Sequence, residues 1–499
     1  MQKTLILAFA CATAFPAAAL AQSGGKIVIA ENFAPKAGFA LETDDANVLA
    51  KAGCLEPLTR IDFDGKLQPS LAESWTQAAP DSWDFKLRKG VTFQDGKPLD
   101  AAAAAASLNA VLKVPTPARA FSPRVIKSVE AVGEDTVRVT TPTPSVLTPL
   151  RLAAANAGIL SPAAYKDGKI DPAGTCTGPF VITRVNGQQS ISLKRNDSYW
   201  GGKVALAEAE IRFIPDANVR ATQLRTGEAD VAGAVPASTL ARLKQTPGLK
   251  VATLATPRTT TLLINTKKAP FDNEKVRQAL QAALDLESIA GSIYEGSVQP
   301  AIGPFAPHEP WVPKAAKPAA YDVRKAQALL AEAGIKPGGL EFEIMAYSEK
   351  VEFKDLAAIL QDQFKAVGIN ARIRLAEYKA LEPDMTAGRY DVALLSRSHL
   401  VDVADPAGFL QSDYGCGGGF NLSQHCDKDF DARLATATGE ADAGKRYAVY
   451  ADLAQHLQSK AVNVFVVHEA GNDGYKTRVR NYRIHPLYQY VLTKDLAVD

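Results

Sequence analysis

The chain has 499 residues, of which 46% are hydrophobic and 22% are charged, and 56 Lys and Arg residues nearly balance 54 Asp and Glu residues. This mixture is typical of a globular protein and excludes a disordered or fibrous chain. The charge balance gives no reason to expect nucleic acid as a partner. At ~150 residues per domain, the length predicts about two to four domains.

The first 21 residues have the three parts of a secretory signal peptide. Lys3 supplies the positive charge, residues 5–20 form an apolar stretch, and Ala19-Leu20-Ala21 is a small-x-small cleavage signal. Cys11 lies inside the apolar stretch, and the residues before it form a poor lipoprotein signal. We therefore expect an exported protein without a lipid anchor, from which residues 1–21 are removed. No later stretch approaches the ~20 apolar residues that are needed to cross a bilayer.

Four cysteines remain after this removal, namely Cys54, Cys176, Cys416 and Cys426. An even number of cysteines in an exported protein suggests disulfides. Cys416 and Cys426 enclose a short Gly-rich loop, so we expect these two to pair, which leaves Cys54 to pair with Cys176. The alternative is a metal site, but the spacings of the four residues match no zinc pattern.

The first part of the mature chain combines short strands, turns and a few helices. Residues 26–30 predict a first strand, which is followed at once by Phe33. Asp100 is expected to cap an Ala-rich helix that runs to about Leu112 and presents its alanines as a packing surface. Residues 125–139 predict two strands around a turn.

From about Arg258 onward, the pattern becomes a regular alternation of strands and helices. Strands are predicted at 259–265, 340–345, 369–375 and 390–395, and amphipathic helices lie between them at 276–284, 326–333, 356–364 and 380–387. This β-α-β-α-β order predicts an α/β fold with an open, mostly parallel sheet.

The final residues after a last strand at 462–468 are too few to form a domain, so we expect them to return to the first part of the chain. This predicts two lobes joined by crossings near Thr256 and His468. Lobe I would comprise residues 22–256 and 468–499, and lobe II would comprise residues 257–467. Such an arrangement is a hinged clamp that holds a ligand between its lobes.

A candidate binding site follows the strand at 390–395. Arg397, His399 and Asp402 come directly after this strand, and Asp405-Pro406 ends the regular structure. Ligands of open α/β sheets bind just beyond the carboxyl ends of the strands. The alternative is a solvated loop, because loops are commonly polar.

Three aromatic residues are further candidates for ligand contact. Phe33 and Tyr378 each lie just past the end of a predicted strand, and Tyr414 follows the candidate loop. Aromatic residues at such places serve equally often in packing within a lobe.

The chain resembles the peptide- and nickel-binding branch (family 5) of the extracytoplasmic solute-binding proteins of ABC importers. The resemblance covers nearly all of the mature chain. It is carried by Leu55-Glu56-Pro57-Leu58, Leu71-Ala72-Glu73-Ser74-Trp75, Leu87 to Phe93 with Asp95-Gly96, Thr177-Gly178-Pro179-Phe180, Asn196 to Trp200, Asn265 with Pro270-Phe271, Val276-Arg277-Gln278-Ala279-Leu280, and Asp285.

The resemblance implies a two-lobed periplasmic-binding-protein-like fold (type II, cluster C) with a subdomain inserted in lobe I, here at about residues 57–173. It also implies a periplasmic protein that delivers a small solute to an inner-membrane ABC permease. In the peptide-binding members, an acidic residue before an Asp-Pro pairs with the α-amino group of the ligand, and Asp402 matches that position. We expect a monomer without a cofactor.

The identity of the solute is left open between two kinds of ligand. Asp402 favours a short peptide or a similar amino-bearing solute. Arg397 is suited to a carboxylate, either of the ligand or of Asp402. His399 together with Arg397 would suit nickel or a metal–metallophore complex, in which case His399 would contact the metal.

An enzyme is a more remote alternative. The sequence contains no HExxH zinc motif, no nucleophile elbow and no P-loop, and its histidines are scattered, which speaks against a secreted hydrolase. A sensor that reports its bound state to a chemoreceptor is compatible with the same fold.

Overall fold

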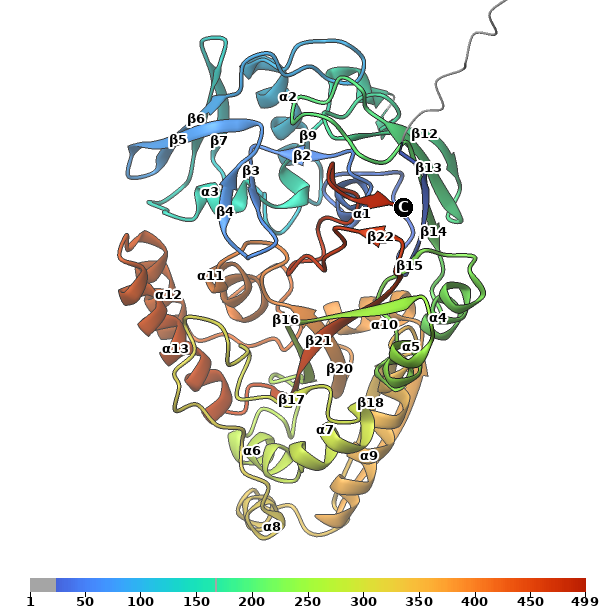
Figure 1. Ribbon diagram of the computed structural model, residues 1–499. Coiled ribbons are helices and arrows are strands. Elements are labelled where there is room, and N and C mark those ends of the chain that lie inside the picture. The colour runs from blue at the N-terminus through green and yellow to red at the C-terminus, as the bar shows by residue number, and fades with distance from the viewer. Residues whose placement is uncertain (1–23, 167) are drawn as a thin grey trace, which may run out of the picture.

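A computed structural model describes residues 24–166 and 168–499 of the chain. The predicted signal peptide (residues 1–21) and Cys11 lie outside these residues. Figure 1 shows an upper half that contains α2 and β5 to β7 and a lower half that contains α6 to α9, with long strands passing between the two. None of the described helices is long and apolar enough to cross a membrane.

The largest sheet has 11 strands and extends through both halves. Its strands are β1 (Lys26–Glu31), β12 (Phe180–Asn186), β13 (Ser190–Arg195), β14 (Glu208–Phe213), β15 (Val231–Ala232), β16 (Leu249–Ile264), β17 (Gln299–Pro300), β18 (Leu340–Tyr347), β19 (Ile369–Ala376), β20 (Val392–Ser398) and β21 (Val464–Lys476). Their order is β12-β13-β14-β1-β15-β21-β16-β20-β18-β19, and β17 pairs with β21. The predicted lobe crossings, near Thr256 and His468, fall within β16 and β21.

The sheet is mixed, and the prediction of a mostly parallel sheet is right only for part of it. Strands β18, β19 and β20 run parallel, with α9 (Glu352–Ala366) and α10 (Tyr378–Thr386) as the connecting helices. By contrast, β16 is antiparallel to both β20 and β21. The reason is that β16 and β21 carry the chain between the halves in opposite directions, so the middle of the sheet must be antiparallel.

The upper half contains a second, four-stranded antiparallel sheet in the order β5-β6-β8-β7. Its strands are β5 (Ala72–Ala79), β6 (Ser82–Leu87), β7 (Ser128–Val132) and β8 (Thr136–Thr140). Helix α2 (Ala101–Leu112) packs against this sheet, and the Asp100 carboxylate accepts a hydrogen bond from the Ala103 N–H at 2.7 Å as the predicted cap. The small faces of Ala101, Ala104 and Ala105 are buried, as the Ala-rich pattern predicts.

Shorter elements complete the fold. Two-stranded sheets are formed by β2 (Glu56–Pro57) with β9 (Gly158–Ile159), β3 (Thr59–Ile61) with β4 (Leu67–Pro69), β10 (Tyr165–Lys166) with β11 (Lys169–Ile170), and β22 (Val479–Arg480) with β23 (Ala497–Val498). The remaining helices are α1 (Asp45–Lys51), α3 (Thr148–Arg151), α4 (Ala217–Thr226), α5 (Leu240–Gln245), α6 (Glu274–Ala282), α7 (Leu286–Tyr294), α8 (Val323–Glu332), α11 (Pro406–Phe409), α12 (Lys428–Gly439) and α13 (Ala443–Ser459).

Each half has its own large hydrophobic core. The upper core contains Ile27, Leu49, Phe85, Leu108 and Phe180, among others. The lower core contains Leu262, Val276, Leu280, Phe342 and Leu360, among others. Separate cores allow each half to move as a rigid body about the strands that join them.

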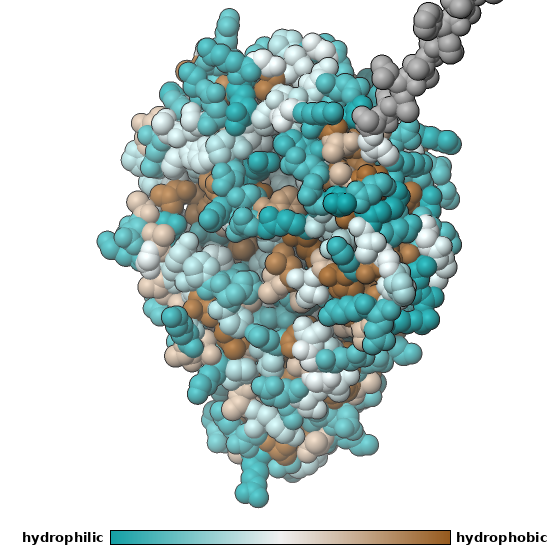
Figure 2. All heavy atoms as spheres, in the orientation of Figure 1, coloured by the Kyte–Doolittle hydropathy of each residue, from teal (hydrophilic) through white to brown (hydrophobic). Residues whose placement is uncertain are grey.

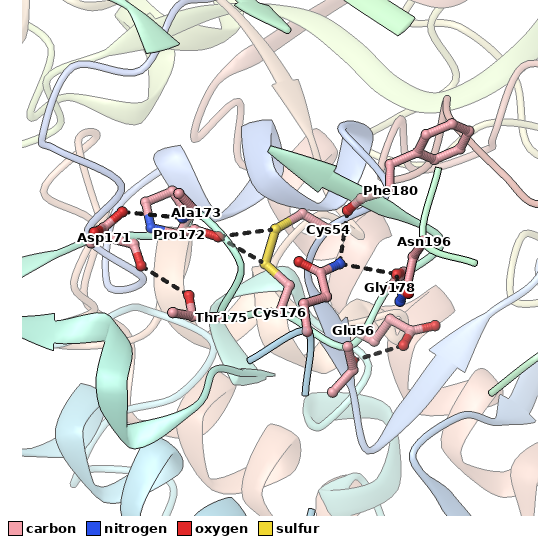
Figure 3. Close-up of a disulfide and its surroundings, with 12 residues drawn as sticks. Cys54, Glu56, Asp171, Pro172, Ala173, Thr175, Cys176, Gly178, Phe180 and Asn196 are labelled. Atoms are coloured by element: carbon pink, nitrogen blue, oxygen red, sulfur yellow. Dashed lines mark hydrogen bonds between the residues drawn. A yellow bond between two sulfur atoms is a disulfide. The ribbon is translucent and has the colours of Figure 1, made fainter. Parts of the chain in front are cut away.

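Both predicted disulfides are present, Cys54–Cys176 and Cys416–Cys426. The first ties the loop after α1 to the segment before β12, and Figure 3 shows it beside the motif residues Gly178 and Phe180. There is no room for a side chain at Gly178, because a Cβ atom would meet the carbonyl oxygens of Gly53 and Cys54.

Glu56 connects several motifs that lie far apart in the sequence but close together in the structure. Its buried carboxylate accepts hydrogen bonds from Thr177 Oγ1 at 2.8 Å, Tyr199 OH at 2.7 Å and Trp200 Nε1 at 2.8 Å. Burial raises the pKa of Glu56, and the three donors oppose that rise. These motif residues therefore join segments of the upper half that are far apart in the sequence.

Candidate functional site

The candidate loop begins where β20 ends, at the face of the lower half that meets the upper half. Residues Val392 to Leu395 are buried, and the polar residues follow directly, as the sequence predicts. Apolar and polar residues of both halves meet here. Figure 2 shows apolar patches on the surface at this middle level of the molecule.

Arg397 is held by two carboxylates of the lower half. Its Nε donates to Asp413 Oδ1 at 2.8 Å, and its Nη2 donates to Asp413 Oδ2 at 3.0 Å and to Asp402 Oδ2 at 2.8 Å. Burial by itself would lower the pKa of Arg397, but the two carboxylates raise it, so the guanidinium remains charged. The bidentate contact with Asp413 fixes the orientation of the guanidinium.

Asp402 is shared between the two halves. In addition to Arg397, its Oδ2 accepts a hydrogen bond at 3.2 Å from Nε of Arg119, which lies in the upper half after α2. Burial alone would raise the pKa of Asp402, but the charges of Arg397 and Arg119 lower it to about 2. The carboxylate is therefore ionised at neutral pH and has cationic partners from the chain itself.

Phe420 completes this arrangement. It lies in the loop that the Cys416–Cys426 disulfide closes. The guanidinium groups of Arg119 and Arg397 lie 4.9 and 4.7 Å from the centre of its ring. Phe420 and Asp402 thus each contact one arginine from the upper half and one from the lower half.

Further contacts connect the same two surfaces. Arg124 Nη1 donates to the Gly417 carbonyl oxygen at 2.5 Å, and Arg151 Nη2 donates to Gln411 Oε1 at 3.4 Å. Apolar residues of both halves, including Ile61, Ala153, Leu400 and Leu487, form a small cluster beside them. The two halves are in contact in this structure, as in a closed clamp.

His399 lies at the end of the same strand but in a different environment. Its Nε2 is 2.6 Å from Glu309 Oε1, and its ring packs against Phe305 and Phe409. The side chain is 1% exposed. In the described part of the chain, no three His, Cys, Asp or Glu side chains are arranged to hold a metal ion.

The three aromatic candidates occupy different positions. Tyr414 is buried, and its hydroxyl accepts a hydrogen bond from Asn463 Nδ2 at 3.2 Å, in a small pocket that Arg397 also lines. Tyr378 begins α10 and packs against Tyr347. Phe33 is 57% exposed. Contact of these residues with a ligand stays a prediction.

Asp405 has a structural position at the start of a helix. Its side chain accepts a hydrogen bond from the Ala407 N–H at 3.0 Å and caps α11. The carboxylate is buried, and burial raises its pKa.

A second group of charges lies where β16 and β21 pass between the halves. Lys350 Nζ is 2.6 Å from Glu469 Oε2, and Thr260 Oγ1 donates to Glu469 Oε1 at 2.6 Å. Arg258 Nη1 donates to the backbone oxygen and to Oγ of Ser396, both at 3.0 Å.

Sequence reasoning missed Arg119, Asp413, Phe420 and this hinge group. Asp413 and Phe420 follow the candidate loop closely and could have been considered with it. Arg119 is 283 residues from Asp402, and nothing local distinguishes it from other exposed arginines.

Comparisons with known proteins agree with the fold and place the chain among transport proteins. A family model described as bacterial extracellular solute-binding proteins, family 5 Middle, matches residues 66–421. The di/tripeptide-binding protein 2 of Pseudomonas aeruginosa is 28% identical over 450 residues, which cover 84% of each chain. The nickel-binding periplasmic protein of Escherichia coli is 29% identical over 445 residues, which cover 83% of each chain.

Solved structures show the same architecture. NikA of Staphylococcus aureus in complex with Ni(L-His)2 superposes with a TM-score of 0.85 at 23% identity, over 95% of this chain and 100% of that one. This similarity confirms the two-lobed fold that the sequence predicts.

Proposed function

Because the chain belongs to the bacterial extracellular solute-binding proteins of family 5, we propose that it captures an amino-bearing small solute, such as a short peptide, in the periplasm and delivers it to an inner-membrane ABC permease. The family consists of solute-binding proteins and not of enzymes. The relatives named as periplasmic support the location. In this proposal the signal peptide directs export and is then removed, and the mature protein is a soluble monomer without a lipid anchor.

The contact of Asp402 with both halves is the observation that carries this proposal. Asp402 receives Arg397 from its own half and Arg119 from the opposite half, so this carboxylate senses whether the halves are together. The Arg119 contact is a single hydrogen bond at 3.2 Å from a side chain that is 32% exposed. A ligand ammonium can take its place, because Arg397 remains bound to Asp402 when Arg119 leaves.

Binding and closure are coupled in this scheme. An ammonium group that enters between the halves can bind the ionised carboxylate of Asp402, whose contact with Arg119 is weaker than its contact with Arg397. Closure of the halves then removes the new ion pair from water and strengthens it. Arg119, once released from Asp402, is free to contact an acidic group of the same solute.

The test is calorimetric titration of the mature protein with a dipeptide and with the same dipeptide acetylated at its N-terminus. The wild type should bind the free amine more tightly, and Asp402→Ala should lose this binding because the ammonium has no counter-charge. Asp362→Ala, an exposed residue of α9, is the matched control. An unchanged dissociation constant in Asp402→Ala would retire the assignment of Asp402.

A nickel complex is the second candidate, because the nickel-binding relative is as similar to this chain as the dipeptide-binding one. His399 is sealed behind Phe305 and Phe409, so a chelate would have to bind through its carboxylates. Titration with nickel in the presence of histidine, in place of the dipeptide, separates the two candidates.

A further inference from the structure

Arg258 lies at an irregularity in the strands that join the two halves. Ala255 of β16 pairs with Ala470 of β21, and the next pair is Thr259 with His468, so β16 contains two extra residues at this point. Arg258 is in this bulge, where β16 also begins to pair with β20. Bulges commonly redirect a side chain next to a functional site. Here the redirected side chain belongs to the hinge between the halves.

The guanidinium of Arg258 is only partly used by the protein. Its Nη1 binds Ser396, whereas within residues 24–166 and 168–499 its Nε and Nη2 have no acceptor and no carboxylate lies within ion-pair distance. Neither atom is among the polar atoms that are buried without a partner, so both retain access to solvent. The edge of a guanidinium that carries Nε and Nη2 is the edge that binds a carboxylate through two parallel hydrogen bonds.

Four other cations around the hinge and the cleft are paired with acids. Lys350 is paired with Glu469 at 2.6 Å, and Lys51 is paired with Glu31 at 2.7 Å. Arg397 is paired with Asp402 and Asp413, and Arg119 is paired with Asp402. Glu469 binds Lys350 and Thr260 and forms no hydrogen bond or ion pair with Arg258, so it does not occupy Nε or Nη2 of Arg258.

Two tyrosines border this position, one from each half. Tyr347 of the lower half accepts a hydrogen bond at its hydroxyl from the Ser396 N–H at 3.3 Å, beside the residue that holds Arg258. Tyr488 of the upper half has a φ of 53°, an unusual conformation for a bulky residue. Its hydroxyl lies against Gly471 of β21, where a Cβ atom would collide with it. Burial raises the pKa of both tyrosines, and the charge of Arg258 opposes that rise.

We propose that Arg258 binds a carboxylate of the transported solute through Nε and Nη2 and thereby restricts the cargo to organic acids, including zwitterions. This inference rests on the proposed function and deepens it, since it names a second charged group of the same solute. Asp402 then receives the amino group and Arg258 the acid group. A solute that carries an amine alone is a poor ligand.

Two pairs of probes test this assignment for both candidate solutes. The first is a dipeptide and its C-terminal amide, and the second is the nickel complex of histidine and that of histamine, which lacks the carboxylate. Titration calorimetry is carried out with the mature wild type, Arg258→Gln, Arg258→Lys and Arg372→Gln. Arg372 is 72% exposed and pairs with Glu341 on the surface, so its variant is the matched control.

The wild type and the Arg372→Gln control should bind the carboxylate-bearing member of at least one pair about tenfold more tightly or better, as a charge-assisted bidentate contact requires. Arg258→Gln should lose this preference, and Arg258→Lys should keep part of it, since it keeps the charge but not the fork. The melting temperature of ligand-free Arg258→Gln should stay close to that of the wild type, because among the described residues Ser396 is the only hydrogen-bond partner of the Arg258 side chain and Glu469 keeps its ion pair with Lys350.

Two results would overturn the inference while leaving the proposed function in place. One is a wild type that binds at least one probe but shows no preference for the carboxylate-bearing member in either pair, and the other is a preference for the acid that survives in Arg258→Gln. A wild type that binds none of the four probes would instead overturn the proposed function for these solutes, and the role of Arg258 with it.

Discussion

Replacement of Arg119 by Ala should shift the ligand-free protein toward an open form. In the structure, Arg119 joins the halves through one hydrogen bond to Asp402 and through its contact with Phe420. Both partners lie in the opposite half. The variant leaves Asp402 paired with Arg397, so neither half is left with an isolated buried charge.

The size of the effect follows from the exposure of the partners. The Arg119 side chain is 32% exposed and that of Asp402 is 12% exposed. A charged hydrogen bond with one partly solvated partner contributes about 1 kcal/mol. A partly exposed cation–π contact adds about 0.5–1 kcal/mol. The sum of about 1.5–2 kcal/mol corresponds to roughly a ten- to thirtyfold change in the ratio of closed to open molecules.

Small-angle X-ray scattering of the ligand-free protein measures this change as an increase in the radius of gyration. Arg372→Ala, at the exposed surface of β19, controls for the loss of an arginine elsewhere. Thermal unfolding should be nearly unchanged, since each half keeps its own core. Scattering profiles of Arg119→Ala and wild type that superimpose would refute the claim that this arginine holds the halves together.

Two further predictions concern stability. Glu469→Gln leaves Lys350, whose side chain is 20% exposed, without its counter-charge, and should lower the free energy of unfolding by about 2 kcal/mol at pH 7. Burial alone would raise the pKa of Glu469, but Lys350 and Arg258 lower it from 4.5 to about 2, so this contribution is present above pH 4.5 and is lost as the pH falls toward 2. Denaturant unfolding at pH 7 and pH 3 should therefore show a larger acid-induced loss in the wild type than in the variant, and equal losses would contradict the assignment. Gly178→Ala should lower stability by about 1–3 kcal/mol, because the new methyl group meets backbone oxygens, whereas Gly291→Ala, where space is open, should not; thermal unfolding of the two variants distinguishes them.

The sequence predicts those parts of the fold that depend on local patterns. Helix α2 begins after Asp100 and ends at Leu112 as expected, because a side-chain cap and an Ala-rich run act over a few residues. The α6 helix buries Val276, Ala279 and Leu280 for the same reason. The direction of strand pairing cannot be predicted in this way, because the sequence of one strand does not identify the strand that pairs with it. The antiparallel middle of the sheet was therefore not predicted from the sequence.

The motifs identify the family without revealing what each residue does. Glu56 and Trp200 are 144 residues apart, and only the folded chain shows that one accepts a hydrogen bond from the other. Arg277, another motif residue, is buried and donates to four backbone oxygens, among them those of Phe271 and Ala461. Buried polar groups that need several partners tolerate few substitutions.

In the candidate site, too, some contacts could be predicted from the sequence and others depend on the fold. Arg397 and Asp402 are five residues apart and pair as their proximity allows. His399 lies between them in sequence, yet it faces Glu309 and two aromatic rings, because the direction of a side chain beyond the end of a strand depends on what packs there. Arg119 follows α2 in the upper half and Arg258 lies in β16, where the halves join, and their positions depend on the arrangement of the whole chain.

The structure also changes the reasoning about Asp402. A buried carboxylate needs a cationic partner, and the sequence alone offers either the ligand or Arg397 for that role. In the folded chain, Arg397 is the permanent partner, and Arg119 occupies the place that an ammonium would take. A ligand must therefore compete with Arg119, and a bare amine gains little from the exchange of one cation for another. A solute that also presents an acid to Arg258 gains a contact that the protein does not make by itself. Selectivity for zwitterions then follows from a balanced charge pair at Asp402 and an unmatched charge at the hinge.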